Sequence, residues 1–267
     1  MIRAIVCGAA GRMGGRIIAL MKEAGDFELA GAVERPDHPA LGRDAGEVAG
    51  IGKAGIPLGA ELAQVARGGQ VGFDFTAPEA AIQNIAKAAD AGLAMVVGTT
   101  GMKAEALARA RELARRIPLL IAPSMSVGVN VMYTLLAQAA AKLGDDYDVE
   151  IFEIHHHFKA DAPSGTAAKM AQVIAGALGR ELDQVGVYGR KGMVGERKPR
   201  EIGVHALRGG DIAGEHTVIF AGMGERVELT HRAHSRDNFA RGALRAARWL
   251  AGRPAGLYDM GDVLGLK

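Results

Sequence analysis

The chain has 267 residues, 49% of them hydrophobic and 23% charged, and its formal net charge at pH 7 is +2. This length suits one large domain or, as we expect, two domains that share a cleft. The near-neutral charge gives no electrostatic reason to expect nucleic acid or a membrane as partner, and no stretch approaches the roughly 20 apolar residues of a membrane helix. The single cysteine, Cys7, excludes an intrachain disulfide and favours a reducing, cytoplasmic location.

A glycine-rich turn follows the first predicted strand, residues 1–7, and precedes apolar residues at helical spacing. A strand, a glycine turn and a helix in this order are typical of a dinucleotide site, because glycines let the backbone approach a pyrophosphate at a helix N-terminus. The spacing is G-x-x-G-x-x-G rather than the commoner G-x-G-x-x-G, so a ligand-free turn stays open as an alternative. The turn consists of Gly8, Ala9, Ala10, Gly11, Arg12, Met13 and Gly14.

An acidic residue ends the second predicted strand, residues 27–33. Glu34 lies twenty residues past Gly14, where a dinucleotide site places an acid that binds the ribose diol. Arg35 follows directly, and a guanidinium there pairs with a 2′-phosphate. Glu34 by itself favours NAD and Arg35 favours NADP, so together they predict a site that accepts NADH or NADPH.

Strands and helices alternate through the rest of the first half. We expect strands at 71–75, 94–97 and 118–121, helices at 78–91 and 103–116, and a surface loop with at most a short strand at 36–59. This alternation predicts a Rossmann-type, doubly wound parallel sheet, in which ligands lie beyond the carboxyl ends of the strands. Small polar segments follow two of these strands, at 98–101 and 122–130, and two at adjacent positions favour a site over ordinary turns.

The second half changes character after a helix at 130–143. A further helix is expected at 166–178, and the segments 202–207, 216–220 and 226–230 look like strands separated by glycine turns. They predict a smaller α+β domain with a mixed sheet, and 183–199 reads as a mobile loop. The helix at 238–250 is expected to return to the first domain. The predicted domains are therefore 1–126 with 236–267, for dinucleotide binding, and 127–235, for substrate binding and oligomerisation.

The segment 150–167 carries the most unusual chemistry of the chain. An apolar strand leads into His155, His156 and His157, and Lys159 and the start of a helix follow within a few residues. Strand alternation would point His155 and His157 one way and His156 the other. Proton donors, a cation and a helix N-terminus then converge, which is what binding and protonating a small anion needs.

A metal site is the competing interpretation of these histidines. The pair His155 and His157 could join His205, His231 or His234 in a metal-dependent hydrolase. The glycine turn and Glu34 would then have no purpose, so no metal is expected. A non-catalytic nucleotide sensor using the first domain is a third reading, and the intact histidine–lysine segment argues against it.

Taken together and in order, the glycine turn, Glu34-Arg35, the 98–101 segment, Ser126-Val-Gly-Val-Asn130 and the 153–166 segment resemble the 4-hydroxy-tetrahydrodipicolinate reductase family, formerly dihydrodipicolinate reductase. The resemblance covers essentially the whole chain. It implies a Rossmann domain, a smaller substrate domain and a homotetramer. It also implies reduction of a cyclic imine dicarboxylate by NADH or NADPH on the diaminopimelate route to lysine. A different imine or amino-acid dehydrogenase is the nearest alternative.

The resemblance also assigns roles to single residues. It implies that residues 8–13 bind the pyrophosphate, that Glu34 and Arg35 contact the adenosine ribose, that His155 donates or accepts a proton and that Lys159 is the proton donor. The segments that it places around the nicotinamide are Gly98, Thr99 and Thr100, with Ala122, Pro123, Ser124 and Met125. The substrate contacts that it implies are His156, Gly165 and Thr166.

The chain departs from the expected pattern at two places. Ser124-Met125 stands where Asn-Phe is frequent, which changes stacking against the nicotinamide, and His157-Phe158 replaces a more polar pair, which leaves His157 without a role. Arg236 and Phe239 begin the return to the first domain, and both are expected to contact the nicotinamide on closure.

Overall fold

The computed structural model describes residues 1–267, which form two compact units. Unit 1 comprises Met1–Val127 and Asp237–Lys267, and unit 2 comprises Gly128–Arg236. The sequence-based division placed both junctions one residue earlier. None of the helices is both long and apolar enough to cross a membrane.

Unit 1 is built on a seven-stranded sheet in which every pairing is parallel, and its strand order is β12-β6-β5-β4-β1-β2-β3. The order reverses beside β1, as in a doubly wound fold. The strands are β1 (Ile2–Cys7), β2 (Phe27–Val33), β3 (Leu58–Gly59), β4 (Val71–Asp74), β5 (Ala94–Val97), β6 (Pro118–Ile121) and β12 (Gly256–Tyr258).

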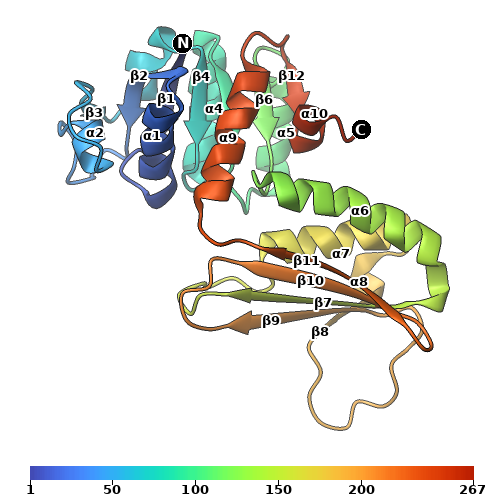
Figure 1. Ribbon diagram of the computed structural model, residues 1–267. Helices are drawn as coiled ribbons and strands as arrows, with labels where there is room; N and C mark the ends of the chain where they lie inside the picture. Colours follow the sequence, from blue (N-terminus) through green and yellow to red (C-terminus); the bar gives the residue numbers. More distant parts are fainter. The chain divides into compact units, whose positions relative to one another are not determined.

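Helices cover both faces of this sheet, so its strands are apolar on both sides (Figure 1). Along β1, Ala4 and Val6 belong to one core cluster, whereas Ile5 and Cys7 belong to the other. The helices of the first face are α1 (Arg12–Ala24), α9 (Asp237–Leu250) and α10 (Met260–Leu264), with the short α2 (Ala45–Val48) beside α1. Those of the second face are α3 (Leu62–Val65), α4 (Pro78–Ala91) and α5 (Ala104–Leu113).

Unit 2 contains a five-stranded mixed sheet of order β11-β10-β7-β9-β8. The middle strand β7 (Asp148–His155) runs parallel to β9 (Ile202–Arg208) and antiparallel to β10 (Glu215–Ala221). Its other elements are β8 (Gly186–Tyr188), β11 (Arg226–Arg232), α6 (Val127–Leu143), α7 (Gly165–Ala177) and α8 (Leu182–Val185). The helices α6 and α7 pack on one face, where Ile151 and Val218 are fully buried (Figure 1). A parallel sheet and a mixed sheet confirm the predicted fold class.

Two local predictions for unit 2 differ from the structure. The strand ends at His155, so the alternation expected through His157 is wrong: the amides of His156 and His157 donate instead to Ile212 and Gly210 in the loop after β9. The segment 183–199, expected as a loop, begins with the end of α8 and the edge strand β8, which pairs with β9. Both deviations depend on pairing with β9 or its following loop, which local sequence does not reveal.

Candidate functional site

The glycine turn joins β1 to α1 in a geometry that only small residues permit. Gly8 has a φ of 71°, which favours glycine. A Cβ added to Gly14 would lie 2.1 Å from the Gly8 carbonyl oxygen, so helix and turn are in direct backbone contact. No side chain caps α1 at Gly11. The first amides of the helix are therefore left for another acceptor, as at a phosphate-binding helix N-terminus.

The Glu34 carboxylate lies at this turn. Its Oε2 accepts a hydrogen bond of 3.0 Å from the amide of Ala10, and its Oε1 accepts one of 3.0 Å from the amide of Arg35. The Arg35 side chain is exposed and pairs with Asp37 at 3.3 Å. The Glu34 carboxylate is thus fixed next to the turn as a hydrogen-bond acceptor, whereas the Arg35 guanidinium is exposed to solvent.

The other predicted cofactor segments lie at the same edge of the sheet. Backbone hydrogen bonds run from Gly8 to Val33, from Gly98 to Asp74 and from Ala122 to Val97, each joining a loop to the last residue of a strand. The residues predicted from sequence at 8–13, 34–35, 98–100 and 122–125 are therefore brought together beyond the carboxyl ends of neighbouring strands, the usual ligand edge of such a sheet.

Sequence reasoning missed a carboxylate that organises this edge. Asp74, the last residue of β4, is fully buried. It accepts hydrogen bonds from the hydroxyls of Thr76 at 2.7 Å and Thr99 at 3.1 Å, and from the amide group of Asn84 at 2.8 Å. The sequence signal that could have revealed Asp74 is an aspartate at the end of an otherwise apolar strand. Asp74 thereby fixes Thr99 in the segment predicted to line the nicotinamide.

Two positions on this edge are defined by close packing. A Cβ on Gly98 would lie 2.1 Å from the Phe75 ring, so the ring occupies the space that a side chain would need. Met125 is 1% exposed and belongs to the core beside α9, where its carbonyl oxygen would be 1.8 Å from a Cβ on Gly242. Met125 is therefore part of the core packing against α9, with almost none of its surface exposed.

In unit 2, His155 at the end of β7 is held by a buried carboxylate. Its Nδ1 lies 2.6 Å from Oε2 of Glu153, whose side chain is fully buried. Arg208, the last residue of β9, donates to both carboxylate oxygens at 2.9 and 3.0 Å. Burial by itself would raise the pKa of Glu153, but hydrogen bonds from His155, Arg208 and the Ser164 amide lower it to about 2. The carboxylate is therefore ionised at neutral pH.

The start of α7 lies against the same carboxylate. The amide of Ser164 donates to Oε1 of Glu153 at 3.0 Å, while the Ser164 hydroxyl caps the helix by accepting from Ala167 at 3.1 Å. Gly165 and Thr166 are the first two helical residues, and their amides have no acceptor within the helix. A Cβ on Gly165 would meet nothing within 4 Å, so the first turn is open to a ligand.

Lys159 follows in the turn after β7. Its Nζ lies 2.9 Å from both carboxylate oxygens of Asp161, and its side chain is 19% exposed. Arg208 donates to the backbone carbonyl of Asp161 at 2.6 Å, so the lysine turn and the Glu153 cluster are connected.

Of the other two histidines in the row, His156 faces Arg236, with its Nε2 3.1 Å from the guanidinium. The exposed His157 packs on the Phe158 ring at 3.7 Å between centroids. No three His, Cys, Asp or Glu side chains are arranged to hold a metal ion.

A buried histidine that the sequence did not single out also belongs to this cluster. His216 on β10 is 4% exposed, and its Nε2 lies 3.0 Å from the Ser164 hydroxyl. Its ring meets that of His155 edge-on at 5.2 Å between centroids. Burial, followed by the nearby charge of His155, lowers the pKa of His216 to about 3, so this imidazole is neutral at physiological pH. Only the sheet pairing of β10 with β7 reveals it.

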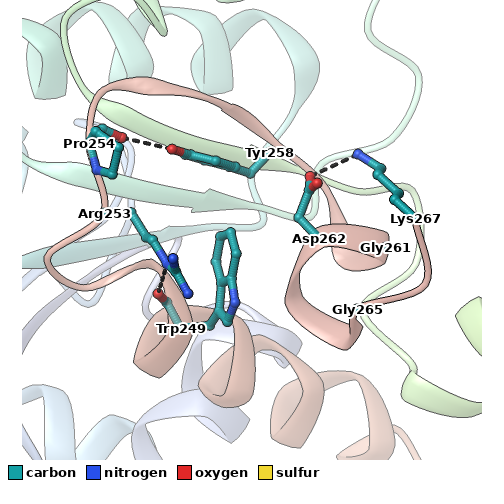
Figure 2. A pocket seen from close by; sticks show the side chains of 8 residues that line it. All are labelled: Trp249, Arg253, Pro254, Tyr258, Gly261, Asp262, Gly265 and Lys267. Carbon is teal, nitrogen blue, oxygen red and sulfur yellow. Dashed lines mark hydrogen bonds and ion pairs between the residues drawn. The ribbon is translucent and has the colours of Figure 1, made fainter.

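A hollow of about 290 Å³ lies near the C-terminus of unit 1 (Figure 2). Its cations are already paired: Lys267 contacts Asp262 at 2.8 Å, and Arg253 stacks 4.2 Å from the Trp249 ring. The hollow is lined by Trp249, Arg253, Pro254, Tyr258, Gly261, Asp262, Gly265 and Lys267. None of these is a predicted site residue.

Comparison with known proteins decides the family. A family model described as dihydrodipicolinate reductase, N-terminus, matches residues 2–125, and one described as dihydrodipicolinate reductase, C-terminus, matches residues 128–264. The chain belongs to the dihydrodipicolinate reductase family. The 4-hydroxy-tetrahydrodipicolinate reductases of Syntrophus aciditrophicus and Geobacter sp. (strain M21) are 57% and 55% identical to it, each over 100% of both chains.

A solved structure shows the same fold. The dipicolinate-bound dihydrodipicolinate reductase from Paenisporosarcina sp. TG-14 matches with a TM-score of 0.74 at 24% identity, over 97% of each chain. The two family models and the curated relatives confirm the predicted family. As a dihydrodipicolinate reductase family member, the protein is an NAD(P)H-dependent oxidoreductase that reduces 4-hydroxy-tetrahydrodipicolinate to tetrahydrodipicolinate on the diaminopimelate route to lysine. This membership decides against the hydrolase, the nucleotide sensor and a different imine or amino-acid dehydrogenase.

Proposed function

We propose that the carboxyl edge of the unit 1 sheet holds the reduced cofactor and that the cluster at the end of β7 binds and protonates the substrate. The observation that carries this proposal is the Glu153 carboxylate, which contacts both the His155 ring and the first residue before α7. A titratable ring and a helix N-terminus open to an anion are thereby fixed side by side, as reduction of a dicarboxylate requires.

The cofactor half follows from the glycine turn. The uncapped start of α1 faces the pyrophosphate, residues 8–13 approach it through backbone amides, and Glu34 accepts hydrogen bonds from the ribose. The Arg35 guanidinium is exposed and free to exchange Asp37 for a 2′-phosphate. The bound cofactor supplies the hydride, and residues 98–100 and 122–125 orient its nicotinamide.

The proposed substrate site in unit 2 acts through charged groups and backbone amides. Hydride delivery to the ring leaves negative charge that spreads toward the imine nitrogen, and a nearby cationic acid stabilises and protonates it. Lys159, held by Asp161 in the turn after β7, is the proton donor, and His155 moves a proton at its Nε2. The amides of Gly165 and Thr166 hold a substrate carboxylate, with His156 as a further contact.

We also propose that the enzyme works in the cytoplasm as a homotetramer. The free, buried Cys7 suits a reducing compartment. The face of the unit 2 sheet that α6 and α7 leave uncovered presents Phe152, Ile154 and the 46%-exposed Leu207, which paired register places on one face. A second copy of the sheet would bury this apolar face.

The decisive variant is Lys159→Ala. We expect kcat to fall about a hundredfold or more, because one transition-state donor is lost, while the Kd for NADH stays within about twofold. Lys169→Ala, at an exposed lysine on α7, is the matched control and should keep wild-type turnover. NADH and NADPH oxidation are measured side by side with enzymatically generated substrate, and unchanged turnover in Lys159→Ala would remove the proposed role.

A further inference from the structure

Glu153 is the most strongly held charged group in unit 2. Its side chain is fully buried, and both oxygens accept two hydrogen bonds each: Oε1 from Ser164 and Arg208, Oε2 from His155 and Arg208. A buried carboxylate costs free energy unless it is paired in this way, and a fold that needed only packing there would use an apolar residue. The arrangement therefore has a purpose beyond filling the core.

The groups around Glu153 come from every element that packs against it. They are His155 on β7, Arg208 on β9, His216 on β10, Ser164 at the start of α7, and the Lys159–Asp161 pair in the turn after β7. His231 on β11 lies beyond His216, with 6.4 Å between ring centroids. Arg208 and His155 are the groups of this set that donate side-chain hydrogen bonds to the carboxylate.

We propose that Glu153 is a positioning residue for the reductase reaction, which fixes the tautomer, orientation and proton affinity of His155. Because the carboxylate is ionised, Nδ1 of His155 must carry the hydrogen that lies in the 2.6 Å contact. Its Nε2 is then the nitrogen that takes up or releases a proton. This inference rests on the proposed role of His155 in proton chemistry.

The surroundings of Nε2 support its assignment as the nitrogen that takes up or releases a proton. Gly214, just before β10, lies behind the ring, and a Cβ there would approach Nε2 to 2.9 Å. Because residue 214 is a glycine, no side chain from this position covers Nε2, and the ring keeps its contact with Glu153. The neighbouring His216 ring is edge-on and neutral, so it packs against His155 without competing for its carboxylate.

The same carboxylate also aligns the two halves of the substrate cluster. Oε1 accepts from the Ser164 amide directly before α7, and Oε2 contacts the His155 ring. The carboxylate therefore fixes the distance between the His155 ring and the start of α7. Arg208 fixes that group in turn through its paired donors, a geometry that lysine cannot reproduce.

The test is a double-mutant cycle of Glu153→Gln and His155→Ala, with kcat, the KM for substrate, the Kd for NADH and the pH profile of kcat/KM as readouts. Glu153→Gln keeps the shape and removes the charge. We expect kcat to fall about 10–100-fold, the Kd for NADH to stay unchanged, and the His155-dependent limb of the pH profile to move to lower pH. In the His155→Ala background, Glu153→Gln should cause no further loss of kcat.

Glu181→Gln is the control. Glu181 is an exposed carboxylate of unit 2 directly before α8, and its side chain makes no capping hydrogen bond to that helix. Its variant should keep the wild-type kcat and pH profile. If Glu153→Gln does not fold, Arg208→Lys, which loosens the carboxylate that holds the ring, should give a smaller loss of kcat that is likewise absent in the His155→Ala background.

The outcomes separate this inference from the proposed function. Equal loss of kcat from Glu153→Gln with and without His155 would overturn the positioning role while leaving His155 in place. Wild-type turnover in His155→Ala would instead overturn the proton role of His155 itself. An unmoved pH profile in Glu153→Gln, with kcat retained, would likewise overturn the inference.

Discussion

Oε2 of Glu34 accepts a hydrogen bond of 3.0 Å from the amide of Ala10, which ties the end of β2 to the glycine turn after β1. The second oxygen of the same carboxylate accepts from the amide of Arg35. Acid and base are adjacent in the chain, but one is fixed against the turn and the other extends into solvent. Because of this difference, we expect mutations of Glu34 and Arg35 to change the preference for NADH and NADPH in opposite ways.

Glu34→Gln should shift the preference from NADH toward NADPH. Loss of the anionic acceptor is expected to raise the KM for NADH about tenfold, equivalent to about 1.4 kcal/mol, and to relieve repulsion of a 2′-phosphate. Arg35→Ala should do the reverse and raise the KM for NADPH more than that for NADH. Steady-state kinetics with both cofactors measure the change, and an equal effect of Glu34→Gln on both would contradict the role of Glu34 in ribose recognition.

Two neighbouring glycines of α1 should respond in opposite ways to alanine. In Gly14→Ala the new Cβ would lie 2.1 Å from the Gly8 carbonyl oxygen, so the turn must move, and we expect a loss of about 1–3 kcal/mol in unfolding free energy together with weaker NADH binding. In Gly15→Ala the nearest atom is 3.8 Å away, and the better helix propensity should add about 0.5–1 kcal/mol. Urea denaturation and NADH titration measure both effects. Equal stability of the two variants would show that the turn tolerates a side chain.

Ser164→Ala should weaken substrate binding more than cofactor binding. The variant removes the cap on Ala167 and the partner of His216, and caps of this kind contribute about 1 kcal/mol. The first turn of α7 then frays where Gly165 and Thr166 are proposed to hold a carboxylate, so the KM for substrate should rise several-fold while the KM for NADH stays constant. Ser164→Thr keeps a hydroxyl and should restore most of the affinity. Parallel changes in both KM values would contradict a local role.

The structure brings the predicted cofactor segments of unit 1 to one edge of the sheet, and the sequence could anticipate this because its signals are local. Gly8, Glu34 and Gly98 each follow a strand that is apolar on both faces, and a parallel sheet brings such strand ends to one edge. Asp74 escaped notice because its role depends on Thr76, Asn84 and Thr99, which only the folded chain gathers around it.

The cluster in unit 2 was predicted in part. His155, Lys159 and the start of α7 lie within one segment, and the family resemblance implied their roles. Arg208 and His216 come from strands 55 and 52 residues further along the chain than their respective partners Glu153 and Ser164, so the pairing of β7 with β9 and β10 is needed to find them. Strand alternation failed at His156 because the backbone leaves the ladder for the loop at 209–212.

His216 should make the protein sensitive to mild acid. Its folded-state pKa is lowered to about 3, first by burial and then by the charge of His155, whereas an unfolded histidine titrates near 6.5. The unfolded chain therefore binds this proton first, so the associated stability is complete above about pH 6.5 and is lost progressively as pH falls toward 3. Protonation of Glu153 lowers the unfolding free energy further only below about pH 4.5, because its folded-state pKa is lowered to about 2.

The window between pH 6.5 and 5 separates the histidines from the carboxylates, and we expect the unfolding free energy to drop there by about 1–2 kcal/mol through His216. His216→Gln should flatten this part of the curve, while His157→Gln, at an exposed imidazole, should follow the wild-type protein. The measurement is urea denaturation at half-unit pH steps. Because burial also lowers the pKa of His231, a residual slope should persist in His216→Gln. An undiminished slope in His216→Gln would mean that its ring takes up a proton in the folded protein, and the neutral contact with Ser164 would then have to be abandoned.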